Sequence, residues 1–328
     1  MKVKRALKNI LPYCFVKKYS SNRTITNVTS IEPKIYNKYG ELMRVFYLKD
    51  NICTHSPYTF SSQNNATTNT ILWDRFNECL PIHFYTHKDM FRTLSKNKNC
   101  FGLLLESETI VPEDYDYLLN HPGCVGQFKA IFTHSQRLIE KYDNAKFIPG
   151  SSVWYGGTAG GGKLDEFAYK KKCKNISLVS SNKAQCELHQ FRIKLASMFF
   201  DSKIVDVMGT FNGGKFISIE ESLREYRYSI VIENNITDCY FTEKLLNCFA
   251  SMTVPIYIGA KKISNYFDEE GIITIDPSMS DEEILDIINR CNEEDYKKRY
   301  NAIMYNYKES KKYECIEDFI FTQYKNLF

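Results

Sequence analysis

The sequence predicts an α/β fold, and three features of its pattern support this prediction. Short apolar runs bounded by polar residues recur along the chain, as in buried parallel strands. Segments with helical spacing of apolar residues lie between these runs. From residue 176 onward the two kinds of segment alternate regularly, which predicts a doubly wound domain with a parallel sheet. A chain of 328 residues is long enough for two domains of ordinary size.

The first half of the chain mixes strand-like runs with polar connections and two helices. Strands are expected at "ELMRVFYL" (41–48), "LPIHFYT" (80–86), "CFGLLLES" (100–107) and "KAIFTHS" (129–135). The segments "PEDYDYLLNH" and "SQRLIEKYD" are expected to form helices.

The second half shows the more regular alternation. Strands are expected at 176–181, 203–209, 228–234, 253–259 and 271–276. Helices are expected at 184–200, 218–227, 242–251 and 280–291. This order is typical of a doubly wound domain, in which ligands bind at the carboxyl ends of the strands.

A glycine-rich segment, "WYGGTAGGGKL" (154–164), separates the two halves. Gly157, Gly162 and Lys163 fit the spacing of a phosphate-binding loop, but Leu164 stands where a Ser or Thr would hold Mg²⁺. Such a loop also follows a strand and precedes a helix directly. We therefore interpret residues 161–175, which comprise the end of this segment and the basic run after it, as a joint between domains.

Charge and composition narrow the function classes. A net charge of +4 is too weak to indicate a nucleic-acid partner, so none is expected. No run approaches about 18 consecutive apolar residues, which argues against a membrane-spanning helix. Eleven cysteines without a C-x-x-C pair favour reduced thiols in a cytoplasm over a disulfide framework or a zinc site. The basic segment 1–18 is either a contact with an anionic membrane surface or a solvated tail.

The segment "YSIVIENNITDCYFTEKLLNCFASMTVPIYIG" (228–259) carries the clearest sign of chemistry. Its strand ends at Glu233, and a helix starts near Thr242, a good N-cap residue. Lys244 in the first turn is unfavourable beside the positive end of a helix dipole, unless an anion such as a diphosphate binds there. The carboxylate of Glu243 could accept hydrogen bonds from sugar hydroxyls. The alternative is an ordinary helix start with a solvated lysine.

This segment resembles the signature of the α1,3-fucosyltransferases, glycosyltransferase family 10. The matching positions are Glu233-Asn234-Asn235, Asp238, Tyr240, Thr242-Glu243-Lys244, Thr253-Val254-Pro255 and Gly259. Upstream, "REYRYSIVIEN", "VDVMG" and "LVSSNKAQCELHQFRIKLASMF" are also similar to the family, so the likeness covers 176 to about 276. Asn235 departs from the usual Ser.

The resemblance implies two Rossmann-like domains that face a cleft, the GT-B type of glycosyltransferase. It also implies an inverting reaction that needs no metal or other cofactor and uses GDP-fucose as donor. The donor-binding residues would be Arg192, Asn234, Tyr240, Thr242, Glu243 and Lys244. Arg192 and Lys244 would neutralise the charge on the departing diphosphate. The D-x-D spelling at 114–116 lies in an expected helix, where a metal role is not expected.

The catalytic base is expected at the end of the strand 100–107. "FGLLLESETIVP" resembles the family segment that carries the catalytic carboxylate, and Glu106-Ser107 fits it best. Glu108 is the alternative, because Pro112 comes later than the proline of the family. Both carboxylates could instead form a surface acidic pair. His134 is a further candidate for the cleft, although a lone His after a strand is more often structural.

The sequence therefore predicts an inverting fucosyltransferase-like enzyme that acts on a surface glycan. The expected organisation is a basic segment 1–18, an acceptor-side domain 19–160, the joint 161–175, a donor domain 176–300 and a helical tail 301–328. Expected partners are the nucleotide sugar, an oligosaccharide or lipid-linked acceptor, and the inner face of a membrane. Two alternatives stay open, namely another nucleotide sugar on the same fold and an inactive glycan- or nucleotide-binding protein.

Overall fold

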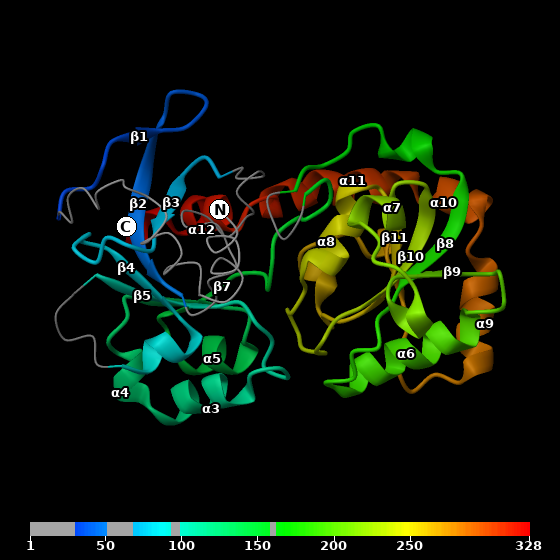
Figure 1. The fold of residues 1–328 in the computed structure, drawn as a ribbon, viewed down its shortest axis with the longest axis horizontal. Helices are drawn as coiled ribbons and strands as arrows, with labels where there is room; N and C mark the ends of the chain where they lie inside the picture. The colour runs from blue at the N-terminus through cyan, green and yellow to red at the C-terminus, as the bar shows by residue number, and fades with distance from the viewer. Residues whose placement is uncertain (1–29, 51–67, 93–98, 158–161) are drawn as a thin grey trace, which may run out of the picture.

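The structure is a computed structural model that describes residues 30–50, 68–92, 99–157 and 162–328. Figure 1 shows two α/β halves side by side, with the first half of the chain on the left and most of the second half on the right. The basic segment 1–18 lies outside the described residues. The predicted α/β class with parallel sheets is confirmed.

Within the described residues the first half forms a seven-stranded sheet in the order β1-β2-β4-β5-β6-β7, with β3 also paired to β2. Every pair is parallel except β1 with β2. The strands are β1 (Ile35–Tyr36), β2 (Leu42–Lys49), β3 (Ile71–Asp74), β4 (His83–Thr86), β5 (Cys100–Leu104), β6 (Ala130–Thr133) and β7 (Ala145–Phe147). The helices on one side of this sheet are η1 (His87–Phe91), α3 (Pro112–Asn120), α4 (Pro122–Val125) and α5 (Gln136–Lys141).

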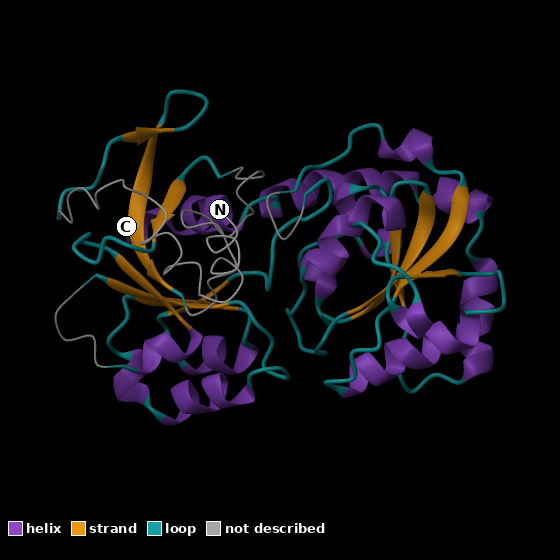
Figure 2. Ribbon diagram, in the orientation of Figure 1, coloured by secondary structure: helices purple, strands orange, loops and turns teal. Residues whose placement is uncertain are grey.

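The second half forms a five-stranded parallel sheet, counted over the described residues, in the order β12-β11-β10-β8-β9. The strands are β8 (Lys174–Val179), β9 (Asp206–Met208), β10 (Tyr226–Ile232), β11 (Val254–Ile258) and β12 (Ile273–Thr274). The α-helices are α6 (Glu187–Phe199), α7 (Ile219–Leu223), α8 (Glu243–Ala250), α9 (Asp281–Arg290), α10 (Glu293–Lys298) and α11 (Tyr300–Ser310). Figure 2 shows helices on both faces of this sheet, as in a doubly wound fold.

Short 3₁₀ turns complete the connections. They are η2 (Ala168–Lys171), η3 (Phe211–Gly213), η4 (Ile263–Asn265), η5 (Glu269–Gly271), η6 (Lys311–Tyr313) and η7 (Lys325–Leu327). No helix among the described residues is both long enough and apolar enough to cross a membrane.

Each sheet has a point where the strand order reverses. In the first sheet the chain passes from β2 to β3 on one side and then to β4 on the other. In the second sheet it passes from β8 to β9 on one side and then to β10 on the other. Ligands of open α/β sheets bind outside the carboxyl ends of the strands at these reversal points.

The last helix, α12 (Ile316–Tyr324), returns to the first sheet, opposite α3 and α5 (Figure 1). The indole Nε1 of Trp73 on β3 donates a hydrogen bond to Glu317 Oε1 at 3.1 Å. The ring of Phe328 lies 5.1 Å from that of Phe101 on β5. The chain therefore crosses between the two halves a second time, and its last residues form part of the first half.

The differences from the expected elements have local causes. The helix expected at 218–227 ends at Leu223, because Tyr226 already pairs with Lys174 as the first residue of β10. Among the described residues, the elements nearest to the glycine-rich segment are β7, which ends at Phe147, and η2, which begins at Ala168. Within the described residues, the strand and helix that a phosphate-binding loop requires therefore do not adjoin it.

Candidate active site

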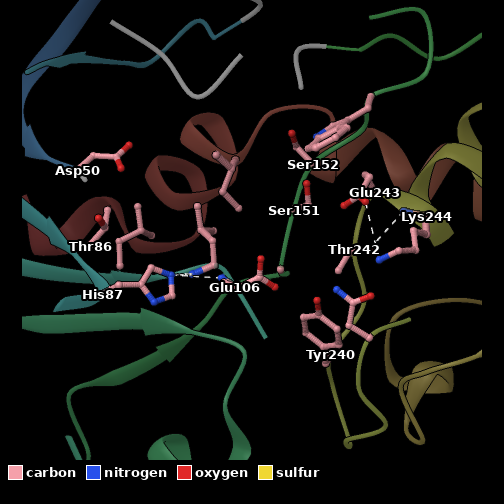
Figure 3. Close-up of a pocket in the computed structure, with 16 residues that line it drawn as sticks. Asp50, Thr86, His87, Glu106, Ser151, Ser152, Tyr240, Thr242, Glu243 and Lys244 are labelled. Atoms are coloured by element: carbon pink, nitrogen blue, oxygen red, sulfur yellow. Dashed lines mark hydrogen bonds and ion pairs between the residues drawn. The ribbon is translucent and has the colours of Figure 1, made fainter. Parts of the chain in front are cut away.

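A cavity of about 260 Å³ lies between the two halves of the molecule. From the first half it is lined by Asp50, Thr86, His87, Leu103, Leu105, Glu106, Gly150, Ser151, Ser152 and Trp154. From the second half it is lined by Asn234, Tyr240, Thr242, Glu243 and Lys244, and Ile316 at the start of α12 completes the lining. The residues that follow β2 and β4 line one side, and a residue that follows β10 lines the other, so the reversal points of both sheets open onto it (Figure 3).

The start of α8 is fixed by a buried carboxylate. Thr242 caps the helix, and its side chain accepts a hydrogen bond from the Lys244 amide. Glu233, fully buried at the end of β10, accepts hydrogen bonds from the Thr242 amide and hydroxyl, each at 2.8 Å. It also holds Lys244 Nζ at 3.2 Å. Glu233 therefore ties the strand to the helix and aims the lysine, a role that the sequence motif does not reveal.

Lys244 is the main cation of the cavity wall. Burial alone would lower the pKa of its ammonium group, but the carboxylates of Glu233 and Glu243 outweigh burial and raise that pKa above its usual value. About a quarter of its side chain is exposed. The lysine is thus charged at neutral pH and can still face a bound anion.

Arg192 on α6 lies in a second cavity, of about 220 Å³, beside the first residues after β8 and β9. Its Nε atom is buried and has no hydrogen-bond partner among the residues that the structure describes. A guanidinium stays charged, so burying part of it without a partner is costly. An anionic ligand would offset that cost.

A histidine connects the two parts of the predicted donor site. His189, one helical turn before Arg192, accepts a hydrogen bond from the Gln185 amide at 3.2 Å through Nδ1. Its Nε2 therefore donates to Asn234 Oδ1 at 3.0 Å. Burial lowers the pKa of His189, and the positive charges of Arg192 and Lys244 lower it further. Arg192 and Lys244 therefore both lie near His189, although they line different cavities.

The two candidate bases have different surroundings. The carboxylate of Glu106 lines the cavity, and one of its oxygens accepts a hydrogen bond from the Ser107 amide at 2.8 Å. Figure 3 shows Glu106 between His87 on one side and Tyr240 and Thr242 on the other. Glu108, by contrast, is bound to Arg137 at 2.7 Å. Of the two, Glu106 is the carboxylate that faces the cavity.

His134 is buried behind the cavity. Its Nε2 lies 3.1 Å from both the Glu106 carbonyl oxygen and the Tyr115 hydroxyl. Burial lowers the pKa of His134 to about 4. The ring contacts that of Tyr240 at 4.5 Å, so this histidine supports two cavity residues from behind.

The aspartates of the D-x-D spelling diverge. Asp114 is buried and binds His87, whereas Asp116 is exposed and binds Arg137. Among the described residues, no group of three or more His, Cys, Asp or Glu side chains is placed to hold a metal ion.

A protein-family model and a solved structure, both of fucosyltransferases, are similar to this chain. The model of "Glycosyltransferase family 10 (fucosyltransferase) C-term" matches residues 169–323. No curated protein matches. A solved α1,3-fucosyltransferase with GDP is similar over 92% of this chain and 94% of that one, at 15% identity and a TM-score of 0.52. That likeness shows a shared fold.

Two further solved structures are more distant. An α1,3-fucosyltransferase with GDP-fucose is similar over 85% of this chain and 86% of that one, at 15% identity and a TM-score of 0.49. TarM is similar over 75% of this chain and 54% of that one, at 12% identity and a TM-score of 0.42.

The two facing Rossmann-like halves are the GT-B architecture of glycosyltransferases. The family match covers the second sheet from η2 onward and includes α8 with its Thr242-Glu243-Lys244 start. The chain is therefore a glycosyltransferase whose residues 169–323 match the C-terminal model of glycosyltransferase family 10, the fucosyltransferases.

Proposed function

We propose that this enzyme transfers fucose from GDP-fucose to a hydroxyl group of a glycan, with inversion and without a metal ion. One observation carries the proposal. Glu106 from the first half and Lys244 from the second half line the same cavity, so a base and a cation flank one space. Inverting transfer needs such a pair, because proton removal and leaving-group departure occur on opposite sides of the sugar.

The reaction is a single displacement. Glu106 takes the proton of the acceptor hydroxyl while that oxygen attacks C1 of fucose. The bond between C1 and the β-phosphate oxygen breaks, and GDP leaves with its electron pair. Lys244 and Arg192 stabilise the negative charge that builds on the diphosphate. Asn234 and Thr242 line the cavity beside Lys244 and contribute polar groups to the same site.

The acceptor side is proposed from the polar and aromatic lining of the first half. Ser151, Ser152 and Thr86 offer hydroxyl groups, and Trp154 offers a ring face against which a sugar can pack. A glycan fits this mixture of hydrogen-bonding groups and one aromatic surface. Membrane contact through residues 1–18 stays a prediction, because that segment lies outside the described residues.

Calorimetric titration with GDP, UDP and CDP in the presence of EDTA tests the donor half of the proposal. We expect selective GDP binding that Lys244→Ala weakens about ten- to hundredfold, since a charge-assisted hydrogen bond is lost. Lys262→Ala is the matched control, because that lysine is exposed and pairs with Asp238. Preference for UDP or CDP would exclude GDP-fucose, and binding that requires a divalent cation would contradict the metal-free mechanism.

A further inference from the structure

The backbone of Glu106 is held on both sides by side chains from distant elements. On one side, His87 Nε2 faces the amides of Leu105 and Glu106, at 3.4 and 3.3 Å. On the other side, the Tyr115 hydroxyl donates to the Glu106 carbonyl oxygen, and His134 Nε2 lies 3.1 Å from it. The carboxylate itself receives only the short-range bond from Ser107 among the described residues.

The orientation of the His87 ring is fixed by Asp114. His87 Nδ1 lies 3.0 Å from Asp114 Oδ2, and Asp114 is 1% exposed. A carboxylate accepts, so Nδ1 carries the proton, and Nε2 is left as the acceptor that the two backbone amides require. Because its lone pair already meets two N–H groups, His87 is not placed to take a proton from a substrate.

His87 also has an uncommon backbone. Its φ is +44°, a value that side-chain-bearing residues rarely adopt. Such a conformation persists when surrounding contacts fix it, and it is frequent at functional sites. Here it sets the ring at the end of β4, beside the end of β5 that carries Glu106.

We infer that His87, oriented by Asp114, is a positioning residue that holds the peptide of the base Glu106 so that its carboxylate faces the acceptor hydroxyl. This inference rests on the proposed function, because it assigns His87 a task in the same reaction. A glutamate in the loop two residues after a strand would otherwise sample several backbone positions. A shift of about 1 Å at a reacting group can cost about a hundredfold in rate.

The pair His87→Gln and His87→Leu tests the inference. Both variants meet the same backbone strain at position 87, but only Gln can place a hydrogen-bond acceptor near the position of Nε2. The control is Lys88→Leu, which breaks the exposed ion pair with Glu113 next to the His87–Asp114 pair. Two quantities are measured in each full-length variant: hydrogen exchange of the Leu105 and Glu106 amides, and GDP release from GDP-fucose, with water as acceptor.

We expect His87→Leu to exchange both amides faster and to lower kcat about tenfold or more, while the KM for GDP-fucose and the Kd for GDP stay within about twofold. His87→Gln should recover most of both properties, and Lys88→Leu should match the wild type. Equal behaviour of His87→Leu and wild type, or equal impairment of the Leu and Gln variants, would overturn the inference. A wild type that neither releases GDP from GDP-fucose nor binds GDP would instead refute the proposed function, and amide exchange would still decide whether His87 holds this peptide.

Discussion

At the scale of single residues, the surroundings of each carboxylate decide what it can do. Glu106 and Glu108 are two positions apart in the chain, yet of the two only Glu108 forms an ion pair with Arg137. Likewise, Glu233 and Glu243 both approach Lys244, but only Glu233 is fully buried and bonded to the helix start. Glu233 thus has a structural role at the helix start, while Glu106 and Glu243 line the cavity, where a substrate can reach them.

His134 gives a prediction about pH. Its pKa is about 4 in the folded protein, against an ordinary value of 6.5, so between these values the unfolded chain binds the proton and the folded protein does not. Stability is therefore fully present above pH 6.5 and is lost as the pH falls toward 4, by about 3 kcal/mol from this group. Urea unfolding at pH 7 and pH 4.5 should show a smaller loss in His134→Gln than in the wild type. Equal losses in both proteins would contradict this account of His134.

At the scale of elements, the loop after β10 meets the segment after β7 at close range. The Gly150 amide donates to the Phe241 carbonyl oxygen at 3.0 Å. A Cβ atom at Gly150 would lie 2.7 Å from Tyr240 Cε2 and 3.1 Å from Thr242 Cγ2. The two halves of the cavity wall therefore touch at a position that has room for glycine alone.

Gly150→Ala should push Tyr240 and Thr242 out of place. We expect a loss of about 2 kcal/mol in unfolding free energy, as in other overpacked sites, together with weaker GDP binding. Gly123→Ala is the control, since nothing lies within 4 Å of its added Cβ. Thermal unfolding and calorimetry measure the two effects. Wild-type stability and GDP binding in Gly150→Ala would contradict this close contact between Gly150 and Tyr240.

At the scale of the whole molecule, the two halves share one apolar core. Buried side chains of the first sheet and of α8 belong to the same cluster, which includes Phe101, Phe132, Leu245 and Phe249. The ring of Phe147 on β7 lies 5.0 Å from that of Tyr266 in the second half. This contact sets how the half that carries Glu106 faces the half that carries Lys244.

The return of α12 is expected to stabilise the first half strongly. Asp318 accepts hydrogen bonds from the amides of Asn69 and Thr70, both at 2.9 Å, and from the Thr70 hydroxyl at 2.6 Å. Asp318→Ala would remove the acceptor of these three hydrogen bonds and should cost about 3 kcal/mol in unfolding free energy. Glu294→Ala, which removes an exposed pair with Lys298, should cost less than about 0.5 kcal/mol. Urea unfolding of both variants checks this, and equal costs would contradict it.

Much of this architecture is predictable from local pattern. In the second half, the spacing of apolar residues clearly distinguishes strands from helices. The start of α8 at Thr242 follows from the N-cap preference of threonine. By contrast, β3 and β7 are too short for a periodic signal. The pairing of α12 with β3, and of His87 with Asp114, depends on residues far apart in the chain. The sequence assigns Arg192 and Lys244 to the same diphosphate, and only the fold shows that the two residues line different cavities.

The most direct test of the central claim compares Glu106→Gln with Glu108→Gln in fucose transfer from GDP-fucose, with EDTA present and a panel of labelled glycans as acceptors. The account predicts that the wild type and Glu108→Gln transfer fucose. It predicts that Glu106→Gln loses about a thousandfold in kcat while it binds GDP normally, because only the base is removed. Full activity of Glu106→Gln, or loss of activity in Glu108→Gln alone, would contradict it.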